Sequence, residues 1–327
     1  MVTNDLEEAL SGQDLARLDD ILGTKEKPKY LPSLKKLLSN LSSKAVNSVR
    51  RSPRYRRIME KVPPSLKPIL REAQYELTTL VQDGRRDMFT AVAIETTSIC
   101  NRKCGYCPNS KPDLLAKRPQ KEMDMGLYIS IIDDLARIGF QGRVALQHYG
   151  EPLKDSQIDE RVRIACEKLP LALITLYSNG DMLTPERLEA LVEAGIGNIL
   201  VTNHNPSGRM SSTLRRLNAY LDENPEMRAY CQVRNGIQTL SNRTGLVEIP
   251  EAKLRNTQYC VPPTHNAVID VEGNAVICSN DYLGNVTLGN VQTDGIMNIW
   301  NSERYRTLRH ELKRGIFTEE ICKTCTG

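Results

Sequence analysis

Short apolar runs alternate with amphipathic stretches through the middle of the chain. Compact apolar runs are typical of buried strands, and apolar residues spaced three and four apart are typical of helices that cover a sheet. The predicted strands span 91–96, 144–148, 171–177, 198–202 and 229–233. The predicted helices span 127–138, 158–168, 185–194 and 210–222. Because strands that alternate with helices pair in parallel through right-handed crossovers, the pattern predicts an open or closed α/β barrel.

The first 88 residues are predicted to form a helical extension. Leucines recur at helical spacing between Leu31 and Leu41, and no segment has a convincing strand pattern. Arginines cluster between Arg50 and Arg57. Two interpretations fit these features. One is a helical extension with a solvated basic face, which we favour; the other is a surface helix that contacts anionic lipid, nucleic acid or a partner protein.

The segment after residue 246 has a different texture. Residues 266–270 and 274–278 flank a short turn and predict a β-hairpin. Residues 296–313 predict one helix, which carries the only tryptophan, Trp300. The chain is therefore expected to have three parts: the extension at 1–88, a barrel at 89–246 and a C-terminal module at 247–327.

Composition and charge exclude several classes of protein. Of the 327 residues, 40% are apolar, which is enough for a hydrophobic core. No run approaches the roughly 18 apolar residues of a membrane span. The acidic, polar start is unlike a secretory signal, so a cytoplasmic location is expected. The net charge of +4 is small and gives no reason to expect nucleic-acid binding.

The chain has nine cysteines, and seven of them fall into two groups. A chain of this length without an export signal is not expected to be a disulfide scaffold. Clustered thiols in a reducing compartment more often bind metal or carry out redox chemistry. The other two, Cys166 and Cys231, lie in a predicted helix and a predicted strand, where packing in the core is the default interpretation.

The first group is Cys100, Cys104 and Cys107. It follows the first predicted strand, so it is expected at the C-terminal, catalytic end of the barrel. Thiolates are soft ligands that suit iron–sulfur clusters or zinc. A structural zinc site normally needs a fourth Cys or His nearby, and this loop contains no histidine. A four-iron cluster held by three cysteines leaves one iron open to a small molecule.

This loop resembles the signature of the radical S-adenosylmethionine (SAM) superfamily, in which an aromatic residue, here Tyr106, commonly precedes the last cysteine. The resemblance implies an α/β fold with a partial (β/α)6 TIM-like barrel. It also implies a [4Fe-4S] cluster on the three cysteines, with SAM bound at the open iron. An electron from the cluster would then cleave SAM to methionine and a 5′-deoxyadenosyl radical.

Two further segments resemble the SAM-binding motifs of this superfamily. Tyr149-Gly150-Glu151 matches the Gly-Gly-Glu region that holds the methionyl amine, with Tyr149 in place of the first glycine. Ser178-Asn179-Gly180 ends the third predicted strand and is similar to the segment that approaches the ribose and carboxylate. The residues assigned to SAM binding are Tyr106, Tyr149, Gly150, Glu151, Ser178, Asn179 and Arg234.

The second group is Cys260, Cys278, Cys322 and Cys325. Taken alone, a hairpin pair followed by a Cys-x-x-Cys motif fits structural zinc and an iron–sulfur cluster about equally well. The whole C-terminal pattern resembles the SPASM/Twitch module of radical SAM enzymes. Because the sequence stops soon after Cys325, the resemblance implies the Twitch arrangement, a single auxiliary [4Fe-4S] cluster with four protein ligands. The spacing is similar to that in the subgroup that includes an alcohol dehydrogenase of butirosin biosynthesis.

The resemblance implies an oxidoreductase of natural-product biosynthesis that acts on a small sugar, cyclitol or nucleoside-type substrate. The adenosyl radical would abstract hydrogen from a secondary alcohol, and the auxiliary cluster, which has no vacant iron, would accept an electron. An external electron donor such as flavodoxin or ferredoxin is expected. The alternatives are a ribosomal-peptide maturase with a peptide substrate, a redox-neutral epimerase, decarboxylase or dehydratase, and a non-enzymatic zinc or iron–sulfur protein.

Three residues are candidates for catalysis on the substrate. Glu95, at the end of the first predicted strand, is a candidate acid or base. Arg243 is a candidate clamp for a carboxylate or hydroxyls. Cys231 is a candidate hydrogen-atom donor, by its resemblance to the lone thiol of related epimerases. His148, Asn203 and His204 are further candidates for the lining of the pocket.

Overall fold

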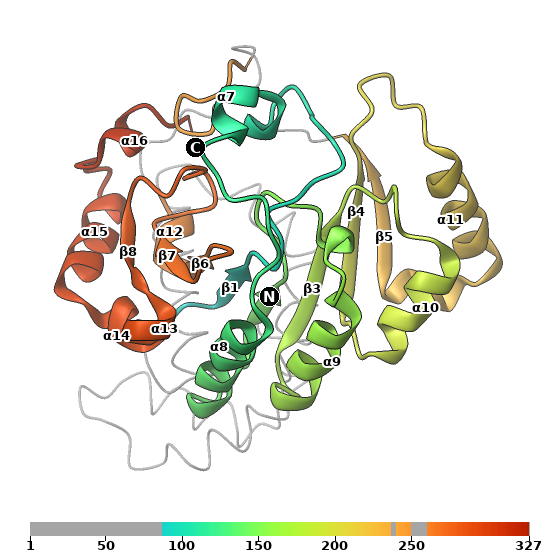
Figure 1. Cartoon of the computed structure of the whole chain (residues 1–327), viewed down its shortest axis with the longest axis horizontal. Coiled ribbons are helices and arrows are strands. Elements are labelled where there is room, and N and C mark those ends of the chain that lie inside the picture. Colours follow the sequence, from blue (N-terminus) through green and yellow to red (C-terminus); the bar gives the residue numbers. More distant parts are fainter. Residues whose placement is uncertain (1–86, 237–239, 250–259, 327) are drawn as a thin grey trace, which may run out of the picture. The chain divides into compact units, whose positions relative to one another are not determined.

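The computed structural model describes residues 87–236, 240–249 and 260–326 (Figure 1). The predicted helical extension, with its basic segment, lies almost entirely outside these residues. Among the helices of the described ranges, none combines the length and the apolar character that crossing a membrane requires.

A mixed sheet of eight strands forms the centre of the structure, in the order β5-β4-β3-β2-β1-β6-β7-β8. Its first five strands pair in parallel. They are β1 (Ala91–Ile94), β2 (Arg143–Ala145), β3 (Leu173–Ser178), β4 (Asn198–Asn203) and β5 (Cys231–Asn235). Each of the five predicted strands is present, with its ends shifted by a few residues, and the α/β fold is confirmed.

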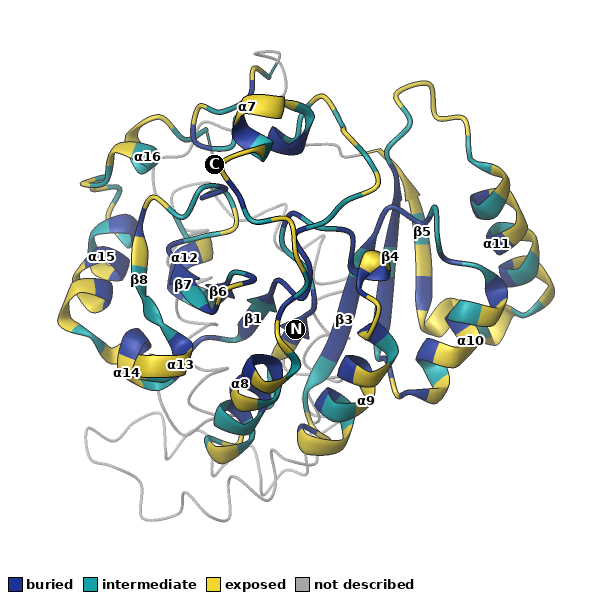
Figure 2. Cartoon of the chain, viewed as in Figure 1, coloured by how far each residue is buried: buried dark blue, intermediate teal, exposed yellow. Residues whose placement is uncertain are grey.

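Four amphipathic helices connect the parallel strands. They are α8 (Met125–Arg137), α9 (Ile158–Lys168), α10 (Pro185–Glu193) and α11 (Ser212–Glu223). Each buries its apolar stripe and exposes its polar side, which Figure 2 shows as alternating blue and yellow segments. Asp124, Thr184 and Ser211 begin three of these helices, because each side chain accepts a hydrogen bond from a backbone N–H of the first turn.

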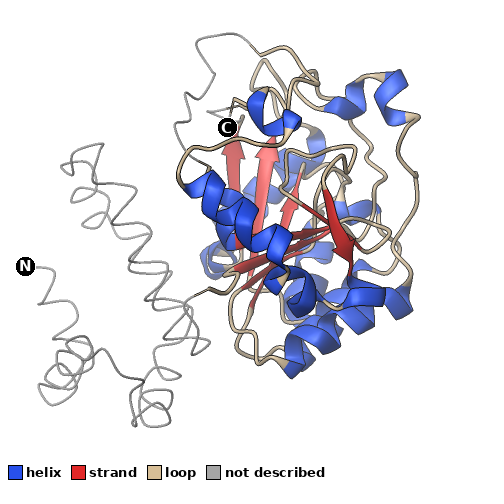
Figure 3. Ribbon diagram, turned by 90° about the vertical axis from the view of Figure 1, so that its left-hand side faces the viewer, coloured by secondary structure: helices blue, strands red, loops and turns tan. Residues whose placement is uncertain are grey.

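The sixth parallel strand of the partial barrel comes from the C-terminal module. β6 (Asn266–Ile269) pairs in parallel with β1, with Asn266 opposite Ala91. β7 (Asn274–Val276) and β8 (Thr287–Asn290) then extend the sheet by antiparallel pairing. The hairpin was expected from the sequence, but its place beside β1 was not. The module and the barrel therefore share one hydrogen-bonded sheet, drawn in red in Figure 3.

The single helix predicted at 296–313 is wrong, because the structure has two helices there. α14 (Ile296–Asn301) ends before Ser302, and α15 (Glu303–Lys313) begins after it. Ser302 is the N-cap of α15, since its hydroxyl accepts a hydrogen bond from Tyr305 N at 3.3 Å. Apolar residues continue on both sides of the break, so periodicity alone predicts one helix.

Short helical turns complete the described structure. They are η1 (Pro108–Ser110), α7 (Pro112–Leu115), η2 (Pro152–Lys154), η3 (Pro225–Ala229), α12 (Pro262–His265), α13 (Val291–Asp294) and α16 (Glu320–Lys323). An aromatic cluster joins the C-terminal helices to the segment before β1. Trp300 lies edge-on to Phe89, with ring centroids 5.1 Å apart, and Arg309 stacks 3.9 Å above the Trp300 ring. Arg309 also pairs with Asp87 at 2.7 Å.

Candidate active site

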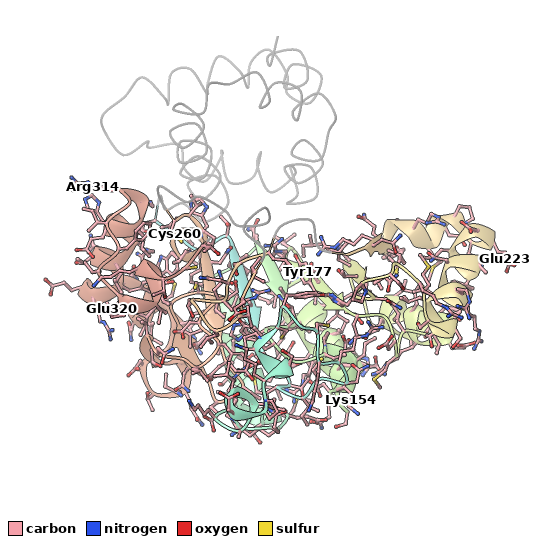
Figure 4. The ribbon with its side chains drawn as sticks, turned by 90° about the horizontal axis from the view of Figure 1, so that it is seen from above. Lys154, Tyr177, Glu223, Cys260, Arg314 and Glu320 are labelled. Atoms are coloured by element: carbon pink, nitrogen blue, oxygen red, sulfur yellow. The ribbon has the colours of Figure 1, made fainter. Side chains whose placement is uncertain are left out.

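A cavity at the C-terminal ends of the strands brings the predicted cofactor residues together. Its lining contains all three cysteines of the first group and every residue assigned to SAM binding. These are Cys100, Cys104, Cys107, Tyr106, Tyr149, Gly150, Glu151, Ser178, Asn179 and Arg234. Tyr177 on β3 also lines the cavity, and Figure 4 shows it between Cys260 on one side and Glu223 on the other. The residues therefore meet as the prediction requires, while their roles in binding SAM stay a prediction.

The three-cysteine loop holds half-buried thiols beside the cavity. Cys107 N donates to Cys104 O at 2.8 Å, and Arg102 N donates to Cys100 Sγ at 3.4 Å. Burial raises the pKa of Cys100 to about 11, and it also raises the pKa values of Cys104 and Cys107. Without a metal the three thiols are therefore protonated at neutral pH, and cluster binding would release their protons.

Arg102 and Asp181 join the three-cysteine loop to the loop after β3. Arg102 Nε and Nη2 donate to the two carboxylate oxygens of Asp181, each at 2.5 Å. These hydrogen bonds hold the pKa of Asp181 below its usual range. Asn101 links the same loops, because it donates to Asp181 and accepts from Asn179 Nδ2 at 2.8 Å. Because the two residues lie 79 positions apart and form no local pattern, this pair cannot be predicted from the sequence.

Gly150 and Glu151 connect the loop after β2 to its neighbours. A Cβ atom on Gly150 would lie 1.8 Å from Thr97 O, so only glycine fits where the two backbones cross. The buried carboxylate of Glu151 accepts from Ser178 Oγ at 2.7 Å and from Asn179 N at 2.8 Å. Burial raises the pKa of Glu151, although these bonds oppose it. Three of the residues assigned to SAM binding thus form one hydrogen-bonded unit.

Tyr106 and His204 close another side of the cavity. The Tyr106 hydroxyl and His204 Nδ1 share a hydrogen bond. Burial, together with the charges of Arg102 and Arg234, lowers the pKa of His204 to about 4, so its ring is neutral at pH 7. Arg234 Nε donates to Thr202 Oγ1 at 2.9 Å, which holds this arginine at the cavity.

Glu95 lies outside the cavity lining. Its side chain is fully buried, pairs with Arg118 at 2.5 Å and accepts a hydrogen bond from Tyr149 N at 3.1 Å. His148, which lines the cavity as expected, has its Nδ1 3.8 Å from the Glu95 carboxylate. Burial alone would raise the pKa of Glu95, but His148, Arg118 and the Tyr149 N–H together hold it at about 2. These contacts favour a structural role over the predicted acid or base.

Cys231 and Asn203 also lie outside the lining, on adjacent strands. Cys231, at the start of β5, is fully buried, and burial raises its pKa to about 12. Arg234, further along the same strand, lines the cavity, whereas Cys231 does not. Asn203 on β4 is buried, and its Nδ2 donates to Gly208 O at 2.9 Å. Core packing accounts for Cys231, and its position gives no support to hydrogen-atom donation.

The four cysteines of the second group lie on three separate segments. Cys260 precedes α12, Cys278 follows β7, and Cys322 and Cys325 lie in and after α16. Burial is the main cause that raises the pKa of Cys260 to about 12. Asn280 links two other members of the group, because it donates to Cys278 Sγ at 3.4 Å and to Cys325 Sγ at 3.7 Å. Across the described ranges, no three His, Cys, Asp or Glu side chains converge closely enough to hold a single metal ion.

Arg243 lies in a strained turn between the cavity and the second cysteine group. Its φ is 49° and that of Thr244 is 58°, in the left-handed region that favours glycine. Arg243 lines the cavity, and its Nη1 donates to Asn280 Oδ1 at 2.8 Å. Ser279, which directly follows Cys278, lines the same cavity. The second cysteine group therefore borders the cavity that the first group lines.

Comparison with known proteins identifies two families along the chain. Residues 94–223 match the radical SAM superfamily. Residues 260–326 match SPASM, an iron–sulfur cluster-binding domain. The first match contains the three-cysteine loop, and the second contains all four cysteines of the second group.

Two proteins of known activity are similar to the chain. It is 32% identical over 245 residues to the S-adenosyl-L-methionine-dependent 2-deoxy-scyllo-inosamine dehydrogenase of Niallia circulans, which covers 73% of this chain and 94% of that protein. It is 33% identical over 129 residues to the GTP 3′,8-cyclase of Chlorobaculum tepidum, which covers 39% of this chain and 36% of that one.

Solved structures show the same similarity. The crystal structure of BtrN in complex with AdoMet and 2-DOIA matches with a TM-score of 0.65 at 31% identity, and the match covers 73% of this chain and 94% of that one. An open conformation of BtrN matches with a TM-score of 0.57 at 29% identity. The fold of the described residues is therefore that of a radical SAM enzyme.

The donor sets fit the cofactors of these families. Three thiols at one cavity suit a cluster with an open iron, and four thiols with amide donors beside them suit an auxiliary cluster. The non-enzymatic alternative is wrong, because the chain matches the radical SAM superfamily and is 32% identical to a SAM-dependent dehydrogenase over most of its length. The chain belongs to the radical SAM superfamily, as an oxidoreductase that uses SAM, a [4Fe-4S] cluster and an auxiliary iron–sulfur cluster in a SPASM domain.

Proposed function

We propose that the chain oxidises a secondary alcohol on a small polar molecule of the cyclitol or sugar type. The dehydrogenase of Niallia circulans, named for such a substrate, is similar over nearly its whole length. This similarity favours alcohol oxidation over peptide maturation and over the redox-neutral reactions. We also propose that residues 89–246 form the radical SAM part and residues 247–327 the auxiliary part, in line with the two family matches.

One observation carries the proposal: the second cysteine group borders the cavity that the first group lines. Ser279 and Arg243 are both lining residues, and both are neighbours of the second group. An alcohol oxidation must remove two electrons from the substrate, one with the hydrogen atom and one separately. A redox centre beside the substrate cavity meets the second requirement, and a redox-neutral reaction has no such need.

When bound, SAM and a cluster on the first cysteine group would supply the radical needed to break the carbinol C–H bond, and an auxiliary cluster on the second group would supply an acceptor for the remaining electron. We assign Cys100, Cys104 and Cys107 to the first cluster, and Cys260, Cys278, Cys322 and Cys325 to the second. Glu151 holds the loops after β2 and β3 together through Ser178 and Asn179, and so shapes the SAM site.

Arg243 is the residue we assign to the substrate hydroxyls. Its guanidinium carries five donors in a fixed plane, which suits a ring with neighbouring oxygens. Nη1 bonds Asn280, while Nε is buried and has no partner among the described residues. Because Arg243 lines the cavity, its guanidinium is placed to donate to a hydroxyl of a molecule bound there.

The external flavodoxin or ferredoxin, the cytoplasmic location and a contact of the basic N-terminal segment stay predictions. They concern partners and residues beyond those the structure describes.

The test uses 2-deoxy-scyllo-inosamine deuterated at the carbinol carbon, with SAM and dithionite under anaerobic conditions. We expect a ketone and 5′-deoxyadenosine in equal amounts, with deuterium in the 5′-deoxyadenosine. A panel of cyclitols and amino sugars extends the test if this probe is inert. Formation of 5′-deoxyadenosine without a ketone or deuterium transfer from any of them would contradict alcohol oxidation while leaving SAM cleavage intact.

A further inference from the structure

The side-chain amide of Asn280 lies between the cavity and the second cysteine group. Its Oδ1 accepts from Arg243 Nη1 at 2.8 Å and from Ser241 Oγ at 2.9 Å. Its Nδ2 donates to Cys325 Sγ at 3.7 Å, and its backbone N donates to Cys278 Sγ at 3.4 Å. Asn280 therefore accepts a hydrogen bond from a cavity-lining arginine and donates hydrogen bonds to two thiols.

The turn that carries Arg243 is fixed to the segment that carries Cys325. Asn242 Nδ2 donates to Thr324 O at 2.7 Å. Asn242 and Thr326 exchange two more bonds, from Asn242 N to Thr326 Oγ1 at 3.0 Å and from Thr326 N to Asn242 Oδ1 at 3.1 Å. Because these bonds hold both flanks of Cys325, the turn resists displacement. A change in the contacts of Arg243 therefore reaches Cys325 through the Asn280 amide more easily than through movement of the turn.

Hydrogen bonds to the sulfurs of an iron–sulfur cluster help to set its reduction potential. A donor raises the potential, because it stabilises the reduced state, whose sulfurs carry more negative charge. Hydrogen bonds in series also polarise one another. The positive charge of Arg243 draws electron density toward Asn280 Oδ1, and this makes Asn280 Nδ2 a stronger donor to Cys325.

We propose that Asn280 is a positioning residue that couples the contacts of Arg243 to the reduction potential of the auxiliary cluster. A ligand oxygen that binds the other nitrogens of Arg243 shares its charge, weakens the polarisation of Asn280 and lowers the potential. The auxiliary cluster thus responds to what occupies the cavity. The coupling itself depends only on contacts within the chain. Its use in accepting the second electron of the substrate rests on the proposed function.

The test is a redox titration of the anaerobically reconstituted full-length chain, followed by electron paramagnetic resonance, without substrate. Asn280→Leu keeps the approximate shape of the side chain but removes both polar atoms. We expect a lower potential for the auxiliary cluster and no change for the three-cysteine cluster. An unchanged auxiliary potential would overturn the proposal.

A double-variant cycle separates coupling through Asn280 from the charge of Arg243 acting through space. Arg243→Met lowers the auxiliary potential in either case. If Arg243 acts through Asn280, adding Arg243→Met to Asn280→Leu causes little further shift. If the two single shifts add in the double variant, the charge acts through space, and the relay is ruled out.

Asn285→Leu is the matched control, because Asn285 lies in the same loop and its backbone N and its Nδ2 donate hydrogen bonds to Asp281 instead of to a thiol. It should change neither potential. Each sample is checked for about eight irons per chain, as expected for two four-iron clusters. If Asn280→Leu prevents loading, Asn280→Ala takes its place in the cycle. Loss of auxiliary iron from both, with normal loading of Asn285→Leu, would mean that Asn280 serves assembly and not tuning.

The titration is independent of catalysis. A chain that oxidises no alcohol can still show the coupling, and a chain without the coupling can still oxidise an alcohol. Failure of this inference and failure of the proposed function therefore give different results.

Discussion

The two cysteine groups are built in opposite ways. Cys100, Cys104 and Cys107 lie in one short loop after β1. Hydrogen bonds to the loop after β3 hold this loop at the cavity. The second group lies on three segments, and hydrogen bonds link the last of these segments to the 240–249 turn. The local group lines the cavity, whereas the distributed group borders it through Ser279 and Arg243.

This difference indicates a division of labour. A compact loop with three donors leaves a coordination position for a ligand and needs little of the fold to form. A set drawn from distant segments provides every ligand from protein, so it suits a centre that exchanges electrons and also fastens the module. Changes in the first group should therefore stop radical formation, and changes in the second should uncouple radical formation from product.

Cys104→Ala is expected to have the largest effect. It removes one of the three cysteines that we assign to the first cluster, so 5′-deoxyadenosine formation should fall to background. About four irons per chain should remain, in the auxiliary cluster. Chromatography of the products and an iron assay check both results. Cys166→Ala, which removes a thiol that donates to Gly195 O and lies outside both groups, is the control and should keep activity. Normal 5′-deoxyadenosine formation by Cys104→Ala would contradict the assignment of the first group.

Cys278→Ala should separate the two groups. We expect 5′-deoxyadenosine formation to continue in the presence of the alcohol while ketone formation is lost, because the second electron has no acceptor. The ratio of ketone to 5′-deoxyadenosine measures this uncoupling. A ratio equal to that of the unaltered chain would show that the second group has only a structural role.

Glu151→Gln should weaken SAM binding while both clusters still load. The variant keeps the shape of the side chain but removes the charge that accepts from Ser178 and Asn179 N. A loss of about 1.5–3 kcal/mol is typical of a hydrogen bond to a charged group, which is about 10- to 100-fold in Kd. Calorimetry of SAM binding to the reconstituted chain checks the change. An unaltered Kd would place Glu151 outside the SAM site.

Glu95→Gln should affect stability more than chemistry, in contrast to Glu151→Gln. Loss of the carboxylate leaves Arg118 buried without its charged partner, which costs about 3 kcal/mol. Because the pKa of Glu95 is held at about 2, the carboxylate contributes fully above pH 4.5 and loses its contribution as the pH falls toward 2. Thermal unfolding of the cluster-free protein should show the variant destabilised at pH 7, with a smaller difference in acid. Loss of turnover without loss of stability would restore Glu95 as an acid or base.

Arg102→Lys should have the smallest effect. Lysine keeps the charge but replaces two parallel bonds to Asp181 with one, at a pair that is about one-fifth exposed. We expect a severalfold slower formation of 5′-deoxyadenosine with normal iron content, since the two loops are held less firmly. A rate equal to that of the unaltered chain would show that the Asn101 and Asn179 contacts suffice.

The sequence predicts the parts of the site that are local. The spacing of Cys100, Cys104 and Cys107 is a local pattern. Gly150 follows β2 and Ser178 ends β3, and the C-terminal ends of parallel strands necessarily meet at one edge of the sheet. Position at a strand end does not specify which way a side chain points, so the sequence places Glu95 near the pocket but cannot reveal its buried pair with Arg118. The pairing of β6 with β1 and the bond from Arg243 to Asn280 join residues far apart in sequence, so no periodicity reveals them.

The parallel ladder between β1 and β6 has a consequence for electron movement. The three-cysteine loop follows the end of β1, and Cys278 follows the hairpin that starts with β6. The backbone hydrogen bonds between β1 and β6 therefore fix the position of one cysteine group relative to the other. A slip of one residue would move one cysteine group along the strand by about 3.3 Å and would turn every side chain of the slipped strand to the opposite face. The register of this ladder therefore helps to set how far the second cysteine group lies from the cavity, which is the distance that an electron from the substrate would have to cross.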